Sequence, residues 1–171
     1  VANNPELQKL SILPKYKGVY HTDVADELTK APIHAIHRED LGNVQFADES
    51  DWKDIGTALH DISRQVSDGK IRADLPVAAK TGLAARTARA LGADYRPRTA
   101  REKLVQSIDD VFKRREHDVN ALDADKFQQA RAGLTALARQ GIAPCDMHPS
   151  NWGMRSNGEL AIRDGGCYGV V

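Results

Sequence analysis

Apolar side chains at helical spacing are the feature that most constrains the fold of this chain. From Asp51 onward they recur at steps of three and four residues, and Ser67-Asp68-Gly69 ends the first stripe. Such spacing places the apolar side chains on one face of an α-helix, which must then pack against other elements. The first stripe consists of Trp52, Ile55, Leu59, Ile62 and Val66. We therefore expect a helix that begins near Asp51 and contributes one face to a core.

Two further helices are expected in the middle of the chain. A short Ala-rich helix should run from Leu83 to Leu91 and end at Gly92. Thr99 should begin the next helix, because Glu102 follows it at the spacing of a capping box. The apolar face of this helix consists of Leu104, Ile108, Val111 and Phe112.

The last expected helix begins near Asp123 or Asp125, and Gly141 stands where a C′ glycine would end it. Its apolar face consists of Phe127, Ala130, Leu134 and Leu137. After Gly141 the helical pattern stops and a loop rich in polar side chains follows, as far as Asn151.

Residues 1–47 are the only N-terminal stretch that resembles β-structure. Two short strands are expected at 17–22 and 28–31, around an acidic turn, with Pro32 ending the second. We therefore expect a small N-terminal lobe over 1–47 and a mainly helical C-terminal lobe over 48–171, an α+β arrangement rather than a βαβ repeat.

A hairpin is predicted near the C-terminus, because Asn157-Gly158 separates two short runs, 152–155 and 160–163. Both residues tolerate the positive φ of a two-residue type I′ turn. In that register Asn151 lies opposite Asp164, with the two Cβ atoms about 5 Å apart on one face. Amide and carboxylate oxygens are ligands that Mg²⁺ accepts. The hairpin therefore predicts a magnesium site.

Asp146 lies five residues before Asn151, in the loop that leads into this hairpin. A carboxylate there could accept the proton of an attacking hydroxyl while Asn151 and Asp164 hold a metal ion, which are the roles that phosphoryl transfer requires. His148 is a second candidate catalytic residue that would orient the loop by hydrogen bonding; the alternative is a partly exposed loop histidine. The structural alternative for the whole segment is an Asx-rich loop that caps its own backbone.

These residues resemble the protein-kinase superfamily. Asp146-Met147-His148-Pro149-Ser150-Asn151 is similar to the D-x-x-x-x-N catalytic loop, in the D-x-H-P-x-N form of the aminoglycoside-phosphotransferase branch. Asp164-Gly165-Gly166 stands where the family has D-F-G. The segment 145–166 looks most like short kinase-like proteins of tailed bacteriophages, and the resemblance covers roughly 124–166.

The resemblance implies a minimal protein-kinase-like fold that binds ATP and Mg²⁺. By this resemblance Asp146 is the catalytic base, and Asn151 and Asp164 are metal ligands. The phosphate-binding lysine would be Lys30, on the second expected strand, or Lys80, whose context Val-Ala-Ala-Lys mimics the family's V-A-I-K.

The chain also departs from the family. Pro144 replaces the histidine two residues before the catalytic aspartate, and Gly165 replaces the phenylalanine of D-F-G. The N-terminal part has no glycine-rich phosphate loop, and five residues after Gly166 leave no room for an activation segment. The alternative function is therefore a catalytically inactive, pseudokinase-like protein that serves as a binding or virion-associated structural component.

A remote alternative is a zinc enzyme. His37-Arg38-Glu39 together with 144–148 resembles the H-x-E and P-C-x-x-C motifs of zinc deaminases, with His148 in place of the last cysteine. Cys145, His148 and Cys167 could also form a structural metal site. A disulfide between the two cysteines is conceivable, but free thiols in a reducing cytoplasm are the simpler expectation.

Composition limits the partners. The chain has 24 basic and 24 acidic residues, so it carries no strong signal for nucleic-acid binding. No apolar run approaches the roughly 20 residues that span a bilayer, and the N-terminus lacks a signal-peptide core, so no membrane partner is expected. The expected partners are a nucleotide, a phosphate acceptor of unspecified class, and a virion or host protein. The expected location is the cytoplasm, that of the host if the chain is phage-encoded, or the virion.

Overall fold

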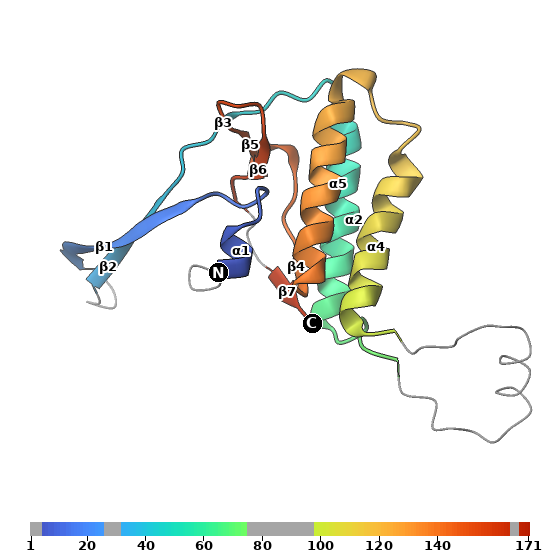
Figure 1. Ribbon diagram of the computed structural model, residues 1–171, viewed down its shortest axis with the longest axis horizontal. Coiled ribbons are helices and arrows are strands. Elements are labelled where there is room, and N and C mark those ends of the chain that lie inside the picture. The colour runs from blue at the N-terminus through green and yellow to red at the C-terminus, as the bar shows by residue number, and fades with distance from the viewer. Residues whose placement is uncertain (1–4, 26–31, 75–97, 165–167) are drawn as a thin grey trace, which may run out of the picture.

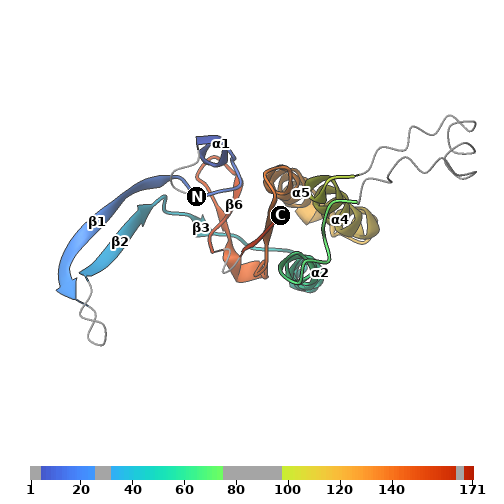
Figure 2. The same cartoon turned by 90° about the horizontal axis from the view of Figure 1, so that it is seen from below.

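The computed structural model describes residues 5–25, 32–74, 98–164 and 168–171, and this part of the chain has an α+β fold. Three long helices pack side by side at one end of the molecule, and a two-stranded hairpin extends from the other end (Figures 1 and 2). Short strands lie between them. One of these strands precedes the loop that holds Asp146, and another follows it.

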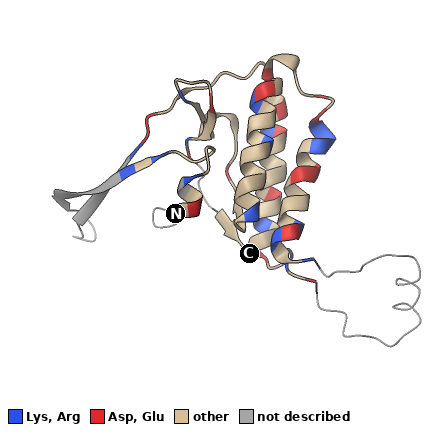
Figure 3. Ribbon diagram, in the orientation of Figure 1, with Lys and Arg blue, Asp and Glu red and all other residues tan. Residues whose placement is uncertain are grey.

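The three helices are α2 (Glu49–Ser67), α4 (Ala100–Arg115) and α5 (Ala124–Arg139). Every apolar residue that the three expected stripes contain is buried, so these helices and their inward faces are confirmed. Basic and acidic residues are interspersed along the helices (Figure 3). Among the described residues, no helix combines the length and apolar character needed to cross a membrane.

The predicted ends of two helices are also confirmed. Thr99 Oγ1 accepts a hydrogen bond from Glu102 N at 3.1 Å, and Glu102 Oε2 accepts one from Thr99 N at 2.8 Å. These reciprocal bonds form the capping box at the start of α4. Gly141 follows α5 with φ of +82°, the left-handed conformation of a C′ glycine. The expected helix over 83–91 lies outside the described residues.

The N-terminal part consists of α1 (Pro5–Gln8) and the antiparallel strands β1 (Tyr16–Ala25) and β2 (Pro32–Arg38). The strand expected over 17–22 is confirmed as part of β1. The expectation that Pro32 ends a strand is wrong, because β2 begins at Pro32. Proline lacks a backbone N–H, but the first residue of a strand at a sheet edge tolerates this loss. The strand expected over 28–31 lies outside the described residues.

Short strands surround the polar loop. β4 (Ile142–Pro144) pairs antiparallel with β7 (Tyr168–Val170). β5 (Trp152–Met154) and β6 (Leu160–Ile162) form the expected hairpin, and β3 (Gly42–Asn43) adds to the β5 edge. Two 3₁₀ turns, Ala121–Asp123 and Pro149–Asn151, precede α5 and β5.

The hairpin turn differs from the predicted one. Gly158 N donates to Arg155 O at 3.0 Å, and Arg155 N donates to Glu159 O at 2.9 Å. The loop therefore has three residues, and Gly158, at φ +84°, takes the left-handed position of a glycine bulge. The extra residue shifts the register by one, so that Trp152 pairs with Ile162 rather than with Arg163.

Arg155 anchors the N-terminal segment to this hairpin. Its side chain is 7% exposed, and Nη2 donates to Glu39 Oε2 at 3.0 Å and to Leu13 O at 2.8 Å. Ser11 O accepts a further bond from Nη1. The hydrogen bonds from Arg155 hold the pKa of Glu39 below its ordinary value. A buried guanidinium is tolerated here because a carboxylate and backbone carbonyls satisfy it.

Asp123 connects the start of α2 to the start of α5. Its carboxylate Oδ2 accepts bonds from Ala47 N at 2.8 Å and from Trp52 Nε1 at 3.4 Å. Oδ1 accepts a bond from Lys126 Nζ at 2.8 Å. Burial raises the pKa of Asp123, but the bonds from Lys126, Asp48 and Ala47 outweigh this effect and leave the pKa lowered.

We predict that Asp123→Asn lowers the free energy of unfolding by about 1–3 kcal/mol at pH 7. The backbone, indole and ammonium groups that donate hydrogen bonds to Asp123 would lose a buried charged acceptor. The folded-state pKa is depressed, so the carboxylate stabilises the fold above the unfolded pKa of about 4 and ceases to do so as pH falls through the folded pKa. The difference in free energy of unfolding between the wild type and Asp123→Asn should therefore shrink below about pH 4, as measured by urea titrations. Asp118→Asn, at an exposed position, serves as the control; an undiminished difference at low pH would contradict the assignment.

Candidate functional site

Helix α2 supports the Asp146–Asn151 loop from behind. A Cβ at Gly56 would lie 2.7 Å from Met147 O, so only glycine allows the loop backbone to approach the helix this closely. One turn later, His60 Nδ1 lies 3.0 Å from Cys145 O. Because a carbonyl oxygen only accepts, Nδ1 of His60 carries the proton in this bond.

Ser63 continues the same row on α2 and connects it to β4, which precedes the loop, and to β7, which pairs with β4. Its Oγ donates to Ala143 O at 3.2 Å and accepts from Gly169 N at 3.2 Å. Sequence reasoning missed Gly56, His60 and Ser63. The available signal was small or polar residues at helical spacing beside an apolar stripe, since they interrupt a face that would otherwise be apolar.

Asn151 is hydrogen-bonded to both Asp146 and Asp164. Its Nδ2 donates to Asp146 O at 2.8 Å. Its backbone carbonyl accepts bonds from Arg163 N at 2.7 Å and from Asp164 N at 3.3 Å. Asp146 and Asp164 are exposed, whereas Asn151 is half-buried. One asparagine therefore joins the backbones of both candidate acidic residues.

Asn151 and Asp164 are neighbours for a different reason from the one predicted. The expected direct cross-strand pairing of Asn151 with Asp164 is wrong, because the glycine bulge moves the register by one residue. Asn151 also ends a 3₁₀ turn instead of extending β5. The two residues are neighbours because the Asn151 carbonyl receives bonds from two successive N–H groups at the end of β6.

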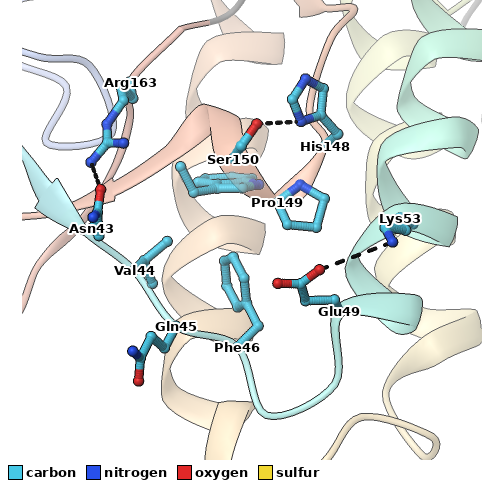
Figure 4. Close-up of a pocket in the computed structure, with 11 residues that line it drawn as sticks. Asn43, Val44, Gln45, Phe46, Glu49, Lys53, His148, Pro149, Ser150 and Arg163 are labelled. Carbon is cyan, nitrogen blue, oxygen red and sulfur yellow. Dashed lines mark hydrogen bonds and ion pairs between the residues drawn. The ribbon is translucent and has the colours of Figure 1, made fainter.

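His148 is held within the loop by its neighbours. Its Nδ1 lies 2.8 Å from Ser150 Oγ (Figure 4), and its Nε2 lies 3.5 Å from Asp146 Oδ1. Both the His148 and Asp146 side chains are about half exposed, at 49% and 51%. The imidazole thus lies between a hydroxyl group and the candidate base.

The residue before Asp164 connects the hairpin to the N-terminal part. Arg163 Nη2 donates to Leu41 O at 2.9 Å, to Gly42 O at 2.7 Å and to Asn43 Oδ1 at 3.0 Å. Burial raises the pKa of Tyr168, and the negative charge of Asp164 adds to this effect. Asp164 therefore lies among groups from both ends of the chain.

A hollow of about 660 Å³, here called the linker hollow, opens beside the loop (Figure 4). Val44 and Phe46 extend from the segment before α2 toward Pro149 and Ser150 on the loop. Its lining also includes Glu49, Lys53, His148, Trp152 and Arg163. Trp152 is buried, and its indole N–H has no hydrogen-bond partner in the part of the chain that the structure describes.

A second hollow of about 430 Å³, here called the helix hollow, lies between α2 and the loop. Asp146 lines this hollow, as do Lys53 and His148, which also line the linker hollow. The two lysines that were predicted to bind phosphate, Lys30 and Lys80, lie outside the described residues. Sequence reasoning did not single out Lys53, which lines both hollows.

The described residues contain no cluster of three or more His, Cys, Asp or Glu side chains that could hold a metal ion. Cys145 is disulfide-bonded, which differs from the expectation of free thiols. Cys167 lies outside the described residues. Within the described part of the chain, these findings give no zinc site around Cys145 and His148.

Comparisons with family models, with curated proteins and with solved structures found no match for this chain.

We predict that Gly56→Ala lowers the free energy of unfolding and displaces the loop, because the added methyl group would meet the Met147 carbonyl. Alanine in a helix interior would otherwise be more favourable than glycine by about 0.5–1 kcal/mol. Urea denaturation of Ala132→Gly, at an exposed position of α5, measures that propensity effect alone. A Gly56→Ala protein more stable than the wild type would contradict the close contact.

Proposed function

We propose that this chain is a kinase-like phosphotransferase of the phage type that uses ATP and Mg²⁺. Asp146 would act as the catalytic base, and Asn151 and Asp164 would be the metal ligands. The observation that carries the proposal is the position of Asn151, which is hydrogen-bonded to the backbone of both acidic residues. The backbones of Asp146 and Asp164, which are separated in sequence, are thus joined through one asparagine.

The donor set suits magnesium. Asp164 offers carboxylate oxygens on an exposed side chain, and Asn151 offers an amide oxygen because its Nδ2 is already used in the bond to Asp146 O. Oxygen ligands of this kind are those that Mg²⁺ binds, together with water and phosphate oxygens. Bound there, the ion would neutralise phosphate charge, which is its usual contribution to phosphoryl transfer.

The linker hollow is the candidate nucleotide site. Its volume of about 660 Å³ lies within the range of small-molecule sites, about 300–1,000 Å³. Val44 and Phe46 give it an apolar wall for a base, and the carboxylate of Glu49 could accept hydrogen bonds from ribose hydroxyls. Ser150, Trp152 and Arg163 line it and are the immediate neighbours of Asn151 and Asp164.

Asp146 has the properties that a general base needs. It is exposed, it lies in a loop that α2 supports, and its carboxylate is 3.5 Å from His148 Nε2. The pair of His148 and Ser150 would limit the rotation of the loop and keep the carboxylate directed at an acceptor hydroxyl. The proton of that hydroxyl would pass to Asp146 as the new oxygen–phosphorus bond forms.

We predict that isothermal calorimetry will detect Mg²⁺-dependent ATP binding by the wild-type chain, and that Asp164→Ala will abolish the Mg²⁺-dependent part. Asp118→Ala, a carboxylate exposed at the end of α4 and outside both hollows, should bind as the wild type does. Unchanged ATP affinity in Asp164→Ala would reject the metal-ligand assignment. A wild-type chain that gives no heat at millimolar Mg-ATP would instead favour the inactive binding or structural protein.

We predict a different result for the base. Asp146→Asn should bind Mg-ATP nearly as well as the wild type, while transfer from γ-labelled ATP should fall by about 10²- to 10⁴-fold, the usual contribution of a general base. Label transfer at the wild-type rate in this variant would remove Asp146 from the chemistry.

A further inference from the structure

The helix hollow lies on the side of the loop where Asp146 is accessible. Helix α2 contributes Lys53, Thr57 and His60, and the loop contributes Asp146, Met147 and His148. The candidate base lines this hollow but not the linker hollow. A molecule whose hydroxyl group loses its proton to Asp146 is therefore placed best in the helix hollow.

The two hollows meet at Lys53 and His148. Among the described residues, only these two line both hollows. A phosphoryl group that moves from a nucleotide in one hollow to an acceptor in the other must pass this boundary. Lys53 is suited to contact the phosphoryl group there, because an ammonium group neutralises phosphate charge.

The ammonium group of Lys53 is only weakly engaged. Its carboxylate partner, Glu49, lies 4.0 Å away, and the two side chains are 66% and 65% exposed. An exposed pair at this distance contributes little and yields readily to a phosphate. The nearby imidazole of His60 donates through Nδ1 to Cys145 O, which leaves Nε2 as an acceptor for a hydroxyl group of a ligand. The lining of the helix hollow thus includes one ammonium group, two imidazoles and one carboxylate.

We propose that the helix hollow binds the phosphate acceptor, a small anionic molecule with a hydroxyl group, and that Lys53 contacts the transferred phosphoryl group. The proposal rests on the proposed function. The acceptor oxygen forms a bond to the γ-phosphorus of ATP, and the bond from that phosphorus to the bridging oxygen breaks. The electron pair of the broken bond leaves with ADP, and the hydroxyl proton passes to Asp146. A hollow of about 430 Å³ suits a small molecule rather than a folded protein.

The test is an NMR titration of the full chain with glycerol 3-phosphate, which carries both the anion and the hydroxyl group. The imidazole resonances of His60 and His148 should shift in a saturable way, while that of His117, exposed beyond the end of α4, should not. Lys53→Met should weaken this binding by about tenfold, as expected for the loss of a charge-assisted contact. Lys53→Arg should retain most of it.

Lys70→Met is the matched control, because Lys70 is equally exposed and has an acidic partner at 3.1 Å but lies outside both hollows. The absence of shifts at His60 and His148, equal shifts at His117, or equal affinity in Lys53→Met would each overturn the proposal. The titration requires no ATP. Failure of the proposed function would appear separately, as a wild-type chain that binds glycerol 3-phosphate but not Mg-ATP.

Discussion

The close approach of helix α2 to the Asp146–Asn151 loop is the contact on which the remaining structure depends. Its apolar stripe packs into the core, and beside that stripe Gly56, His60 and Ser63 contact the loop and strands β4 and β7. Because the helix is rigid and the contacts are made to backbone atoms, the loop is positioned with little freedom. A polar loop that carries exposed carboxylates can thus be held in one conformation without burying those carboxylates.

Buried charged groups in this chain join segments that are distant in sequence. Arg155 ties the N-terminal segment to the hairpin, and Asp123 ties the start of α2 to that of α5. Each charge has an opposite charge and several backbone partners, which compensates for its loss of solvation. Such ties have strict geometry, so they restrict how the segments they join can be arranged, whereas apolar packing alone would tolerate several arrangements.

Two other contacts join the segments around the candidate site. Asn151 joins the loop to the end of β6, and Arg163 joins the same end to the linker before α2. The linker hollow has walls from the linker, α2, the loop and the hairpin, whereas the helix hollow has walls from α2 and the loop. In the proposed function, this arrangement places Asp146 in the wall of the helix hollow and keeps Asn151 and Asp164 next in sequence to residues that line the linker hollow, which suits transfer of a group between two bound molecules.

The sequence alone determined the helices, because periodicity, the capping box at Thr99 and the C′ glycine at Gly141 are local signals that agree with one another. It also identified Asp146, Asn151 and Asp164 as neighbours, although through the wrong hairpin register. Asn-Gly fits a two-residue or a three-residue loop, and these differ little in local energy. The tertiary structure selected the longer loop, in which Arg155 reaches Glu39 and Leu160 N reaches Gln129 Oε1 at 2.7 Å. The roles of Gly56 and Lys53 were likewise decided only by tertiary structure, since both depend on a loop that lies about ninety residues further along the chain.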